Sequence, residues 1–208
     1  MSGFRVRDLA VARGGMPLLS GLSFEVAPGH ALILAGHNGI GKTSLLRTLA
    51  GLQPPLAGEI APGPQQVAYG AHSDGMKATL SVAENLSFWA ELYGAGGIDG
   101  VIADFDLGAL RDRAAQHLSA GQRRRLGLAR MGLSGRPIWL LDEPTVSLDR
   151  ASVARFGEAL ARHLGQGGIA VLASHVDLGI EAPTLDLAAF RARAEAPRGD
   201  VFADGAVE

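Results

Sequence analysis

The chain contains no cysteine at all. Disulfide frameworks and thiol chemistry are therefore excluded, and the composition is compatible with a reducing compartment. Basic residues are not in excess either, because 19 Lys and Arg stand against 21 Asp and Glu, a formal net charge of −2. Proteins that bind nucleic acid usually have a strongly basic balance. We therefore expect no nucleic-acid partner.

Long apolar runs are also missing, and none approaches the roughly 18 consecutive residues that indicate a transmembrane helix. The stretch 1–7 alternates apolar and basic residues like a strand, and it lacks the apolar core of a signal peptide. We therefore expect a cytoplasmic protein without a membrane-spanning segment. Any contact with a membrane is expected to come through partners.

Glycine, by contrast, is abundant, with 29 of 208 residues, about twice its average frequency. Eight consecutive residues fit the phosphate-binding pattern G-x-x-x-x-G-K-[ST] at every fixed position. The apolar run 31–35 before them is typical of a buried strand, and leucines at helical spacing as far as Leu52 follow them. The eight residues are Gly36, His37, Asn38, Gly39, Ile40, Gly41, Lys42 and Thr43.

This order of strand, loop and helix predicts a nucleotide site. The glycines let the backbone bend around a phosphate, so that N–H groups and the positive end of the following helix point at it. Lys42 is expected to reach the β- and γ-phosphates of ATP, and Thr43 to ligate Mg²⁺. The alternative is a glycine-rich turn that carries Lys and Thr without binding a phosphate, and the flanking elements favour the phosphate loop.

The apolar pattern predicts an α/β fold. Alternating residues in 4–9 and 22–26 indicate half-buried antiparallel strands, whereas the uniformly apolar runs 31–35, 138–141 and 169–173 are typical of the middle of a parallel sheet. With 208 residues, the chain can form one α/β domain, or one core with a small inserted subdomain.

Shorter elements are predicted around these strands. We expect short strands at 59–60, 66–70 and 185–190, and a helix over 101–110. Another helix is expected after Ser81, which forms a capping-box pattern with Glu84. Aromatic residues of that helix, Phe88, Trp89 and Tyr93, belong either to a core stripe or to a docking surface for another protein.

The stretch 118–122, Leu-Ser-Ala-Gly-Gln, precedes a further expected helix. Arg123, Arg124 and Arg125 follow it directly, and such a run is found at phosphate or nucleic-acid contacts and on solvated surfaces. Because consecutive residues of a helix point in different directions, we expect these arginines to be mostly solvated.

Polar residues follow two of the apolar runs. Asp142 and Glu143 come directly after 138–141, and His175 comes shortly after 169–173. Ligands of α/β sheets bind at the carboxyl ends of the strands. Carboxylate oxygens suit Mg²⁺, and a second carboxylate can polarise the water that attacks a γ-phosphate. The alternatives are a strand-end acid with a structural role and an ordinary surface histidine.

The ordered set of motifs resembles the ATP-binding subunits of ABC transporters. The resemblance covers nearly the whole chain and implies a P-loop NTPase fold with a RecA-like core, an antiparallel β subdomain and an inserted α-helical subdomain. It implies a single ABC domain, in which 1–72 and 136–208 form the core and β subdomain and 73–135 approximately the helical subdomain. The matching motifs are the phosphate loop 36–43, the signature 118–122 against L-S-G-G-Q, the strand ending in Asp142 and Glu143, the D-loop 147–149 and the switch histidine His175.

The resemblance also implies roles for these residues. Asp142 would hold Mg²⁺ and its water shell, Glu143 would activate the attacking water, and His175 would contact the γ-phosphate. The signature residues Ser119, Ala120, Gly121 and Gln122 would face the γ-phosphate bound by a second copy. Two chains would thus close head-to-tail over two ATP molecules, and hydrolysis would move attached integral membrane subunits.

Three positions depart from the family pattern. Ala120 replaces the first glycine of the signature, a small change in size. Family members usually carry an aromatic residue that stacks on adenine, whereas here Arg13 is the candidate. The loop after Tyr69 usually carries a glutamine that touches Mg²⁺, and here Ser73 is the candidate, with a shorter side chain.

Within the family, the short chain, the LSAGQ form of the signature and the stretch 71–77 resemble the ATP-binding subunits of the haem exporter of cytochrome c maturation. This resemblance implies small membrane partners of the CcmB and CcmC kind, a homodimer of ATPase subunits and a peripheral location on the cytoplasmic face of the inner membrane. The alternatives are an ABC transporter for another compound, a soluble ABC ATPase that acts on nucleic acid, and a regulator that binds nucleotide without turnover.

Overall fold

A five-stranded parallel sheet lies at the centre of the protein, whose computed structural model describes residues 3–71 and 75–192. Its strand order is β5-β6-β7-β3-β8. The three apolar runs predicted as central strands occupy the three middle positions of this sheet. The strands are β3 (Ala31–Ala35), β5 (Val67–Gly70), β6 (Ile138–Asp142), β7 (Ile169–Ala173) and β8 (Thr184–Asp186).

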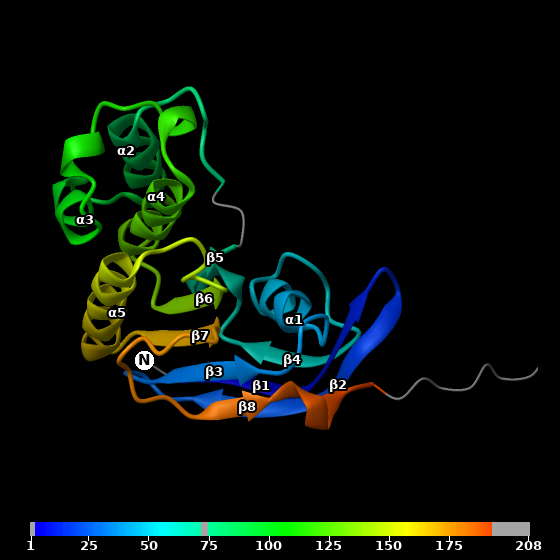
Figure 1. Cartoon of the computed structure of the whole chain (residues 1–208). Helices are drawn as coiled ribbons and strands as arrows, with labels where there is room; N and C mark the ends of the chain where they lie inside the picture. The colour runs from blue at the N-terminus through cyan, green and yellow to red at the C-terminus, as the bar shows by residue number, and fades with distance from the viewer. Residues whose placement is uncertain (1–2, 72–74, 193–208) are drawn as a thin grey trace, which may run out of the picture.

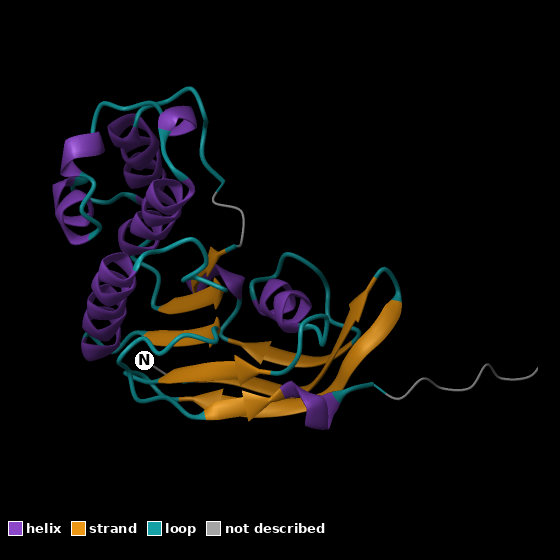
Figure 2. Ribbon diagram, viewed as in Figure 1, coloured by secondary structure: helices purple, strands orange, loops and turns teal. Residues whose placement is uncertain are grey.

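A three-stranded antiparallel sheet packs beside it, in the order β2-β1-β4 (Figure 2). These strands are β1 (Phe4–Arg13), β2 (Met16–Val26) and β4 (Ala57–Ala61). Val6 of β1 pairs with Phe24 on one side and with Ile60 on the other. The alternation in this part of the sequence therefore predicted both the strands and their antiparallel pairing.

Five α-helices complete the described part of the chain. In Figure 1, α1 lies near the antiparallel sheet, whereas α2, α3 and α4 group at one end of the molecule and α5 follows below them. The helices are α1 (Lys42–Leu49), α2 (Val82–Tyr93), α3 (Asp99–Asp104), α4 (Ala120–Leu133) and α5 (Arg150–Gly165). Short 3₁₀ turns are η1 (Pro64–Gln66), η2 (Gly108–Leu110), η3 (Ala115–His117) and η4 (Leu187–Phe190). None of the described helices has both the length and the apolar character needed to cross a bilayer.

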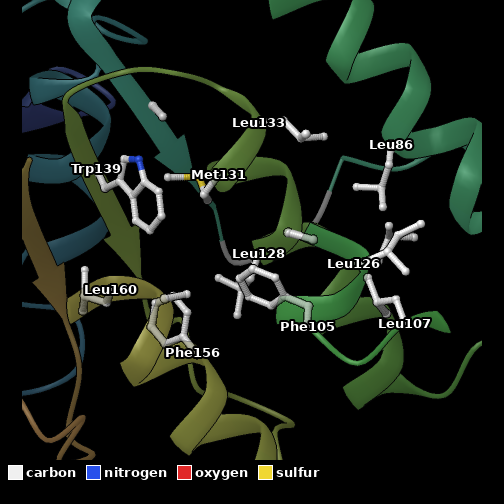
Figure 3. Close-up of a cluster of buried hydrophobic side chains, with 14 of the residues drawn as sticks. Leu86, Phe105, Leu107, Leu126, Leu128, Met131, Leu133, Trp139, Phe156 and Leu160 are labelled. Atoms are coloured by element: carbon white, nitrogen blue, oxygen red, sulfur yellow. The ribbon is translucent and has the colours of Figure 1, made fainter. Parts of the chain in front are cut away.

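The parallel sheet separates two buried clusters, because successive side chains of a strand point to opposite faces. In β6, Ile138 and Leu140 join the cluster around α1 and the antiparallel sheet. Trp139 and Leu141 join the cluster that covers the other face. Figure 3 shows this second cluster running from the sheet to the helices, through Leu86, Phe105, Leu107, Leu126, Leu128, Met131, Leu133, Trp139, Phe156 and Leu160. The helical end of the chain and the sheet therefore share one continuous core.

Three predicted elements differ from the structure. The helix α1 ends at Leu49, because Gly51 turns the chain with φ 71°, and Leu52 beyond it is exposed. The helix expected over 101–110 stops at Asp104. The strand expected over 185–190 is confined to β8, after which η4 begins. The division of the chain at residues 73 and 135 stays a prediction.

Candidate nucleotide-binding site

The phosphate loop connects β3 to α1 and depends on three glycines with positive φ. These are Gly36 at 140°, Gly39 at 86° and Gly41 at 119°, conformations that residues with a Cβ rarely adopt. Ile40 is buried in the cluster below and fixes the loop to the core. Gly41 is the N-cap of α1, so the N–H groups of the first turn face the loop, where an anion can accept from them.

Lys42 is the first residue of α1 and is buried, with 8% of the residue exposed. Its Nζ donates to the Gly36 carbonyl oxygen at 2.6 Å. The Nε2 atom of His175 lies 3.3 Å from the same Nζ. The structure therefore brings the phosphate-loop lysine and the histidine after β7 into direct contact, although they are 133 positions apart in the sequence.

A cavity of about 220 Å³ lies in front of the loop. Residues from the loop, from the strand-end acids and from the antiparallel sheet line it. The lining residues are Arg13, Leu18, Asn38, Gly39, Gly41, Lys42, Thr43, Ser44, Asp142 and Glu143. Thr43 and Asp142 bring a hydroxyl and a carboxylate to one cavity, oxygen donors that suit a hard cation such as Mg²⁺.

Asp142 is buried at the end of β6 and meets a phenol that the sequence did not single out. The Tyr69 hydroxyl donates toward Asp142 Oδ2 at 3.5 Å. Burial, followed by the charge of Asp142, raises the pKa of Tyr69 to about 12. The phenol therefore stays protonated near neutral pH and can keep donating to the carboxylate. The pairing of β5 with β6 places Tyr69 opposite Leu140, two residues before Asp142, and this register is set by the fold and not by any local pattern in the sequence.

Glu143 has φ 47°, in the left-handed region that is unusual for a residue with a side chain. Its N–H donates to the Ala173 carbonyl at 3.0 Å, so the residue stays tied to β7. The Oε1 atom lies 3.6 Å from Nε2 of His175. Nε2 of His175 therefore lies between the ammonium group of Lys42 and the carboxylate of Glu143.

The signature residues start α4. Ser119 is its N-cap, and its hydroxyl accepts from the Gln122 N–H at 3.2 Å, while Gln122 Oε1 accepts from the Ser119 N–H at 2.9 Å. Gln122 thus closes a capping box within its own chain. A Cβ at Gly121 would lie 2.7 Å from the Ser147 carbonyl oxygen, so this position requires glycine. Neither these residues nor Ala120 are among the residues that line the cavity of their own chain.

The expectation of mostly solvated arginines after the signature is wrong. Arg124 is 4% exposed, and its guanidinium donates to main-chain carbonyls, among them those of Asp142 and Glu143. Arg125 pairs with Asp106 at 2.9 Å and bonds to the Phe105 carbonyl. A run of identical charges does not reveal which member the helix turns inward, so this contact could not be predicted from the sequence.

Two predicted contacts are less tightly defined. Arg13 lies at the end of β1, is exposed, and lines the cavity together with Leu18, while its contact with adenine stays a prediction. Ser73 lies outside the described residues, and its contact with Mg²⁺ stays a prediction.

Comparison with known proteins identifies the class. The model of the ABC transporter family matches residues 19–146, and the chain belongs to this family. An ABC transporter ATP-binding protein of Pyrococcus furiosus superposes with a TM-score of 0.80 at 26% identity, covering 92% of this chain and 100% of that one. The predicted P-loop NTPase fold is thereby confirmed, and family membership makes the chain an ATP-hydrolysing domain.

Closer relatives define the group within the class. A protein of Ruegeria pomeroyi is 60% identical over 199 residues, covering 96% of this chain and 97% of the relative. A protein of Rhodobacter capsulatus is 60% identical over 90% of this chain and 88% of its own length. A protein of Bradyrhizobium diazoefficiens is 46% identical over 86% of this chain and 94% of its own length. All three are named cytochrome c biogenesis ATP-binding export protein CcmA, which confirms the resemblance predicted from the sequence.

Proposed function

We propose that this chain is the ATP-hydrolysing subunit of the membrane complex that exports haem, or releases it to a periplasmic chaperone, for cytochrome c biogenesis. The observation that carries the proposal is the 60% identity to an export protein of that name over 96% of the chain. The partners we propose are integral membrane subunits of the CcmB and CcmC kind, with the ATPase peripheral on the cytoplasmic face of the inner membrane.

The residues around the cavity have the chemistry that this activity requires. The N–H groups of the phosphate loop and Lys42 would hold the phosphates of ATP, and Arg13 would lie beside the adenine. Thr43 and Asp142 would hold Mg²⁺, which neutralises phosphate charge when bound. Glu143 would orient and polarise the attacking water, and His175, which contacts Lys42, would contact the γ-phosphate.

The signature supports a head-to-tail homodimer. Ser119 and Gly121 form the exposed tip of α4, whose N-terminus carries partial positive charge. They do not line the cavity of their own chain. A second copy that presented this tip to the cavity would complete the binding of the γ-phosphate and exclude water from the site. Closure with ATP and opening after hydrolysis would then move the membrane subunits.

The experiment that tests the proposal is the substitution Glu143→Gln. The amide retains the shape of the side chain but cannot take a proton, so turnover should fall by roughly 100-fold or more, while ATP stays bound. Steady-state ATP hydrolysis and the amount of bound nucleotide measure the two effects, and covalent haem attachment to cytochrome c in cells should fall in parallel.

The matched control is Glu158→Gln, which changes an exposed acid of α5. This control should leave hydrolysis and cytochrome c assembly unchanged. Hydrolysis by Glu143→Gln at the parental rate would remove Glu143 as the activating base. Loss of hydrolysis with normal cytochrome c assembly would remove the link to haem.

A further inference from the structure

The side chain of Arg124 is buried between three parts of the chain. These are α4, which begins with the signature, the segment after β5, and the end of β6 with the loop that follows it. The side chain extends from the second turn of α4, and Nη1 donates to the Ala71 carbonyl at 2.7 Å, beyond the end of β5. Nη2 donates to the carbonyls of Asp142 at 3.1 Å and Glu143 at 2.9 Å, and Nε to that of Pro144 at 3.0 Å. One guanidinium thus joins the signature helix to the loop that follows β6.

The bond to Glu143 bears on the direction of its side chain. The peptide before this residue is fixed by the bond from its N–H to Ala173, and the peptide after it is fixed by the bond from Arg124. Between the two bonds, Glu143 holds a φ of 47°. The Cα–Cβ direction follows from the backbone, so these two bonds together set the direction in which the Glu143 side chain leaves the main chain.

A second contact joins the same helix to the same loop. Gly121, in the first turn of α4, lies against the carbonyl of Ser147, closely enough that a Cβ would approach that oxygen to 2.7 Å. Ser147 itself has φ 66°. The start of α4 and the loop 142–148 are therefore in contact at two places, one polar and one steric.

We propose that Arg124 is a positioning residue for ATP hydrolysis, which holds the backbone of Glu143 in the conformation that directs its carboxylate at the attacking water. The inference rests on the role given to Glu143 in the proposed function. It adds a residue that is not among those lining the cavity and that acts through the main chain of the loop.

Arginine suits this position because its guanidinium is a rigid planar fork with five N–H donors. Different nitrogens of the one guanidinium donate to different carbonyls, Nη1 to that of Ala71 and Nε to that of Pro144. A lysine ammonium is a single point with three donors on a flexible stem, so it cannot reach all of these carbonyls in one conformation. The substitution Arg124→Lys would keep the positive charge but lose the set of hydrogen bonds to separate carbonyls.

The test compares Arg124→Lys and Arg124→Met with the parent, using the full-length chain in complex with its membrane subunits. A misplacement of about 1 Å at a reacting group can cost about 100-fold in rate. We expect kcat to fall by about 10-fold or more in both variants, with the KM for ATP changed less than about threefold. The control Arg125→Met, which removes the neighbouring guanidinium bonded to Asp106, should retain kcat within about twofold.

A double-mutant cycle separates positioning from general damage to the fold. If Arg124 acts through Glu143, adding Arg124→Lys to Glu143→Gln should lower the residual turnover by less than about twofold. Circular dichroism should show Arg124→Lys folded, and this variant carries the test if Arg124→Met does not fold. An equal loss in both backgrounds, or a kcat of Arg124→Lys within twofold of the parent, overturns the inference.

These outcomes also keep the two proposals apart. If Glu143→Gln itself hydrolyses ATP normally, the proposed role of Glu143 fails, and the role of Arg124 fails with it. If Glu143→Gln is inactive and Arg124→Lys is not impaired, only the positioning role fails, and the assignment of Glu143 stands.

Discussion

At the scale of single residues, the site gathers three ionisable side chains from distant parts of the chain. Lys42 Nζ lies 3.3 Å from His175 Nε2, which lies 3.6 Å from the carboxylate of Glu143. The lysine also donates to the Gly36 carbonyl, so its ammonium is already directed into the loop. This direction matches the place where the glycine loop would put the phosphates.

The first prediction concerns Lys42. Hydrogen bonds to a charged group contribute about 1.5–3 kcal/mol each, so Lys42→Ala should weaken ATP binding by roughly 10- to 100-fold. Titration with a fluorescent ATP analogue measures this Kd. The matched control is Lys77→Ala. The Lys77 ammonium lies over the ring of Phe88 and Lys77 does not line the cavity, so this substitution should leave the Kd unchanged. Equal affinity of parent and Lys42→Ala would show that this lysine does not hold the phosphates.

The residues of the site divide into those that the sequence could predict and those that it could not. Lys42 and Thr43 follow from fixed spacing in a loop whose geometry is local, and the two acids follow from a strand end. Tyr69 and Arg124 act through contacts between elements, and the sequence carries no spacing rule for such contacts. The arginine run in particular favoured solvent, whereas tertiary packing buries its middle member.

At the scale of elements, β6 and α5 meet in an aromatic stack. The rings of Trp139 and His163 lie 4.0 Å apart between centroids and 11° from parallel. A Cβ at Gly168 would collide with the imidazole at 2.4 Å, so the glycine after α5 makes room for it. Burial lowers the pKa of His163 below its ordinary 6.5.

The second prediction follows from this pKa. Because the folded protein binds the proton of His163 less readily than the unfolded chain, protonation favours unfolding. Its contribution to stability is complete above pH 6.5 and is lost as the pH falls toward the lower, folded pKa. The urea concentration at the midpoint of unfolding should therefore decrease as the pH is lowered below 6.5. His163→Phe, which keeps an aromatic ring on Trp139, should show a weaker dependence.

Because other groups also titrate in this range, the prediction concerns the difference between the pH dependence of the parent and that of His163→Phe. His30→Phe replaces an exposed histidine and serves as the control, with a curve that follows the parent. Parallel curves for the parent and His163→Phe would show that this histidine is not the group responsible.

Element boundaries show where local signals stop being sufficient. The capping box at Ser81 and Glu84 predicted the start of α2, and both of its hydrogen bonds are present. The end of α3 was not predictable in this way. Asp106 adopts φ 51° there, and the turn lets Phe105 and Leu107 enter the core that Figure 3 shows. Packing of these two side chains decides the boundary, and packing is not visible in a local pattern.

At the scale of the whole molecule, the site lies on an open face. The cavity lies at the carboxyl ends of the parallel strands, and apolar side chains of the loops that follow β6 and β7 are exposed, Val146 to 42% and Val176 to 47%. Ser119, at the tip of α4, lies outside this cavity. The proposed head-to-tail dimer would bury the cavity, the exposed valines beside it and the N-terminus of α4.

The last prediction uses the two functions proposed for Ser119, which caps α4 in its own chain and would bind a phosphate of the second copy. Aspartate is as good an N-cap as serine, so Ser119→Asp should keep the helix and the stability of the monomer. Its carboxylate would nevertheless repel the γ-phosphate. The variant Glu143→Gln should accumulate as an ATP-bound dimer, which analytical ultracentrifugation detects. Adding Ser119→Asp to this variant should leave the chain monomeric. Ser81→Asp makes the same change at the cap of α2 and should leave the dimer intact. A dimer that tolerated Asp at position 119 would place this helix tip away from the phosphates, and the head-to-tail arrangement would have to be given up.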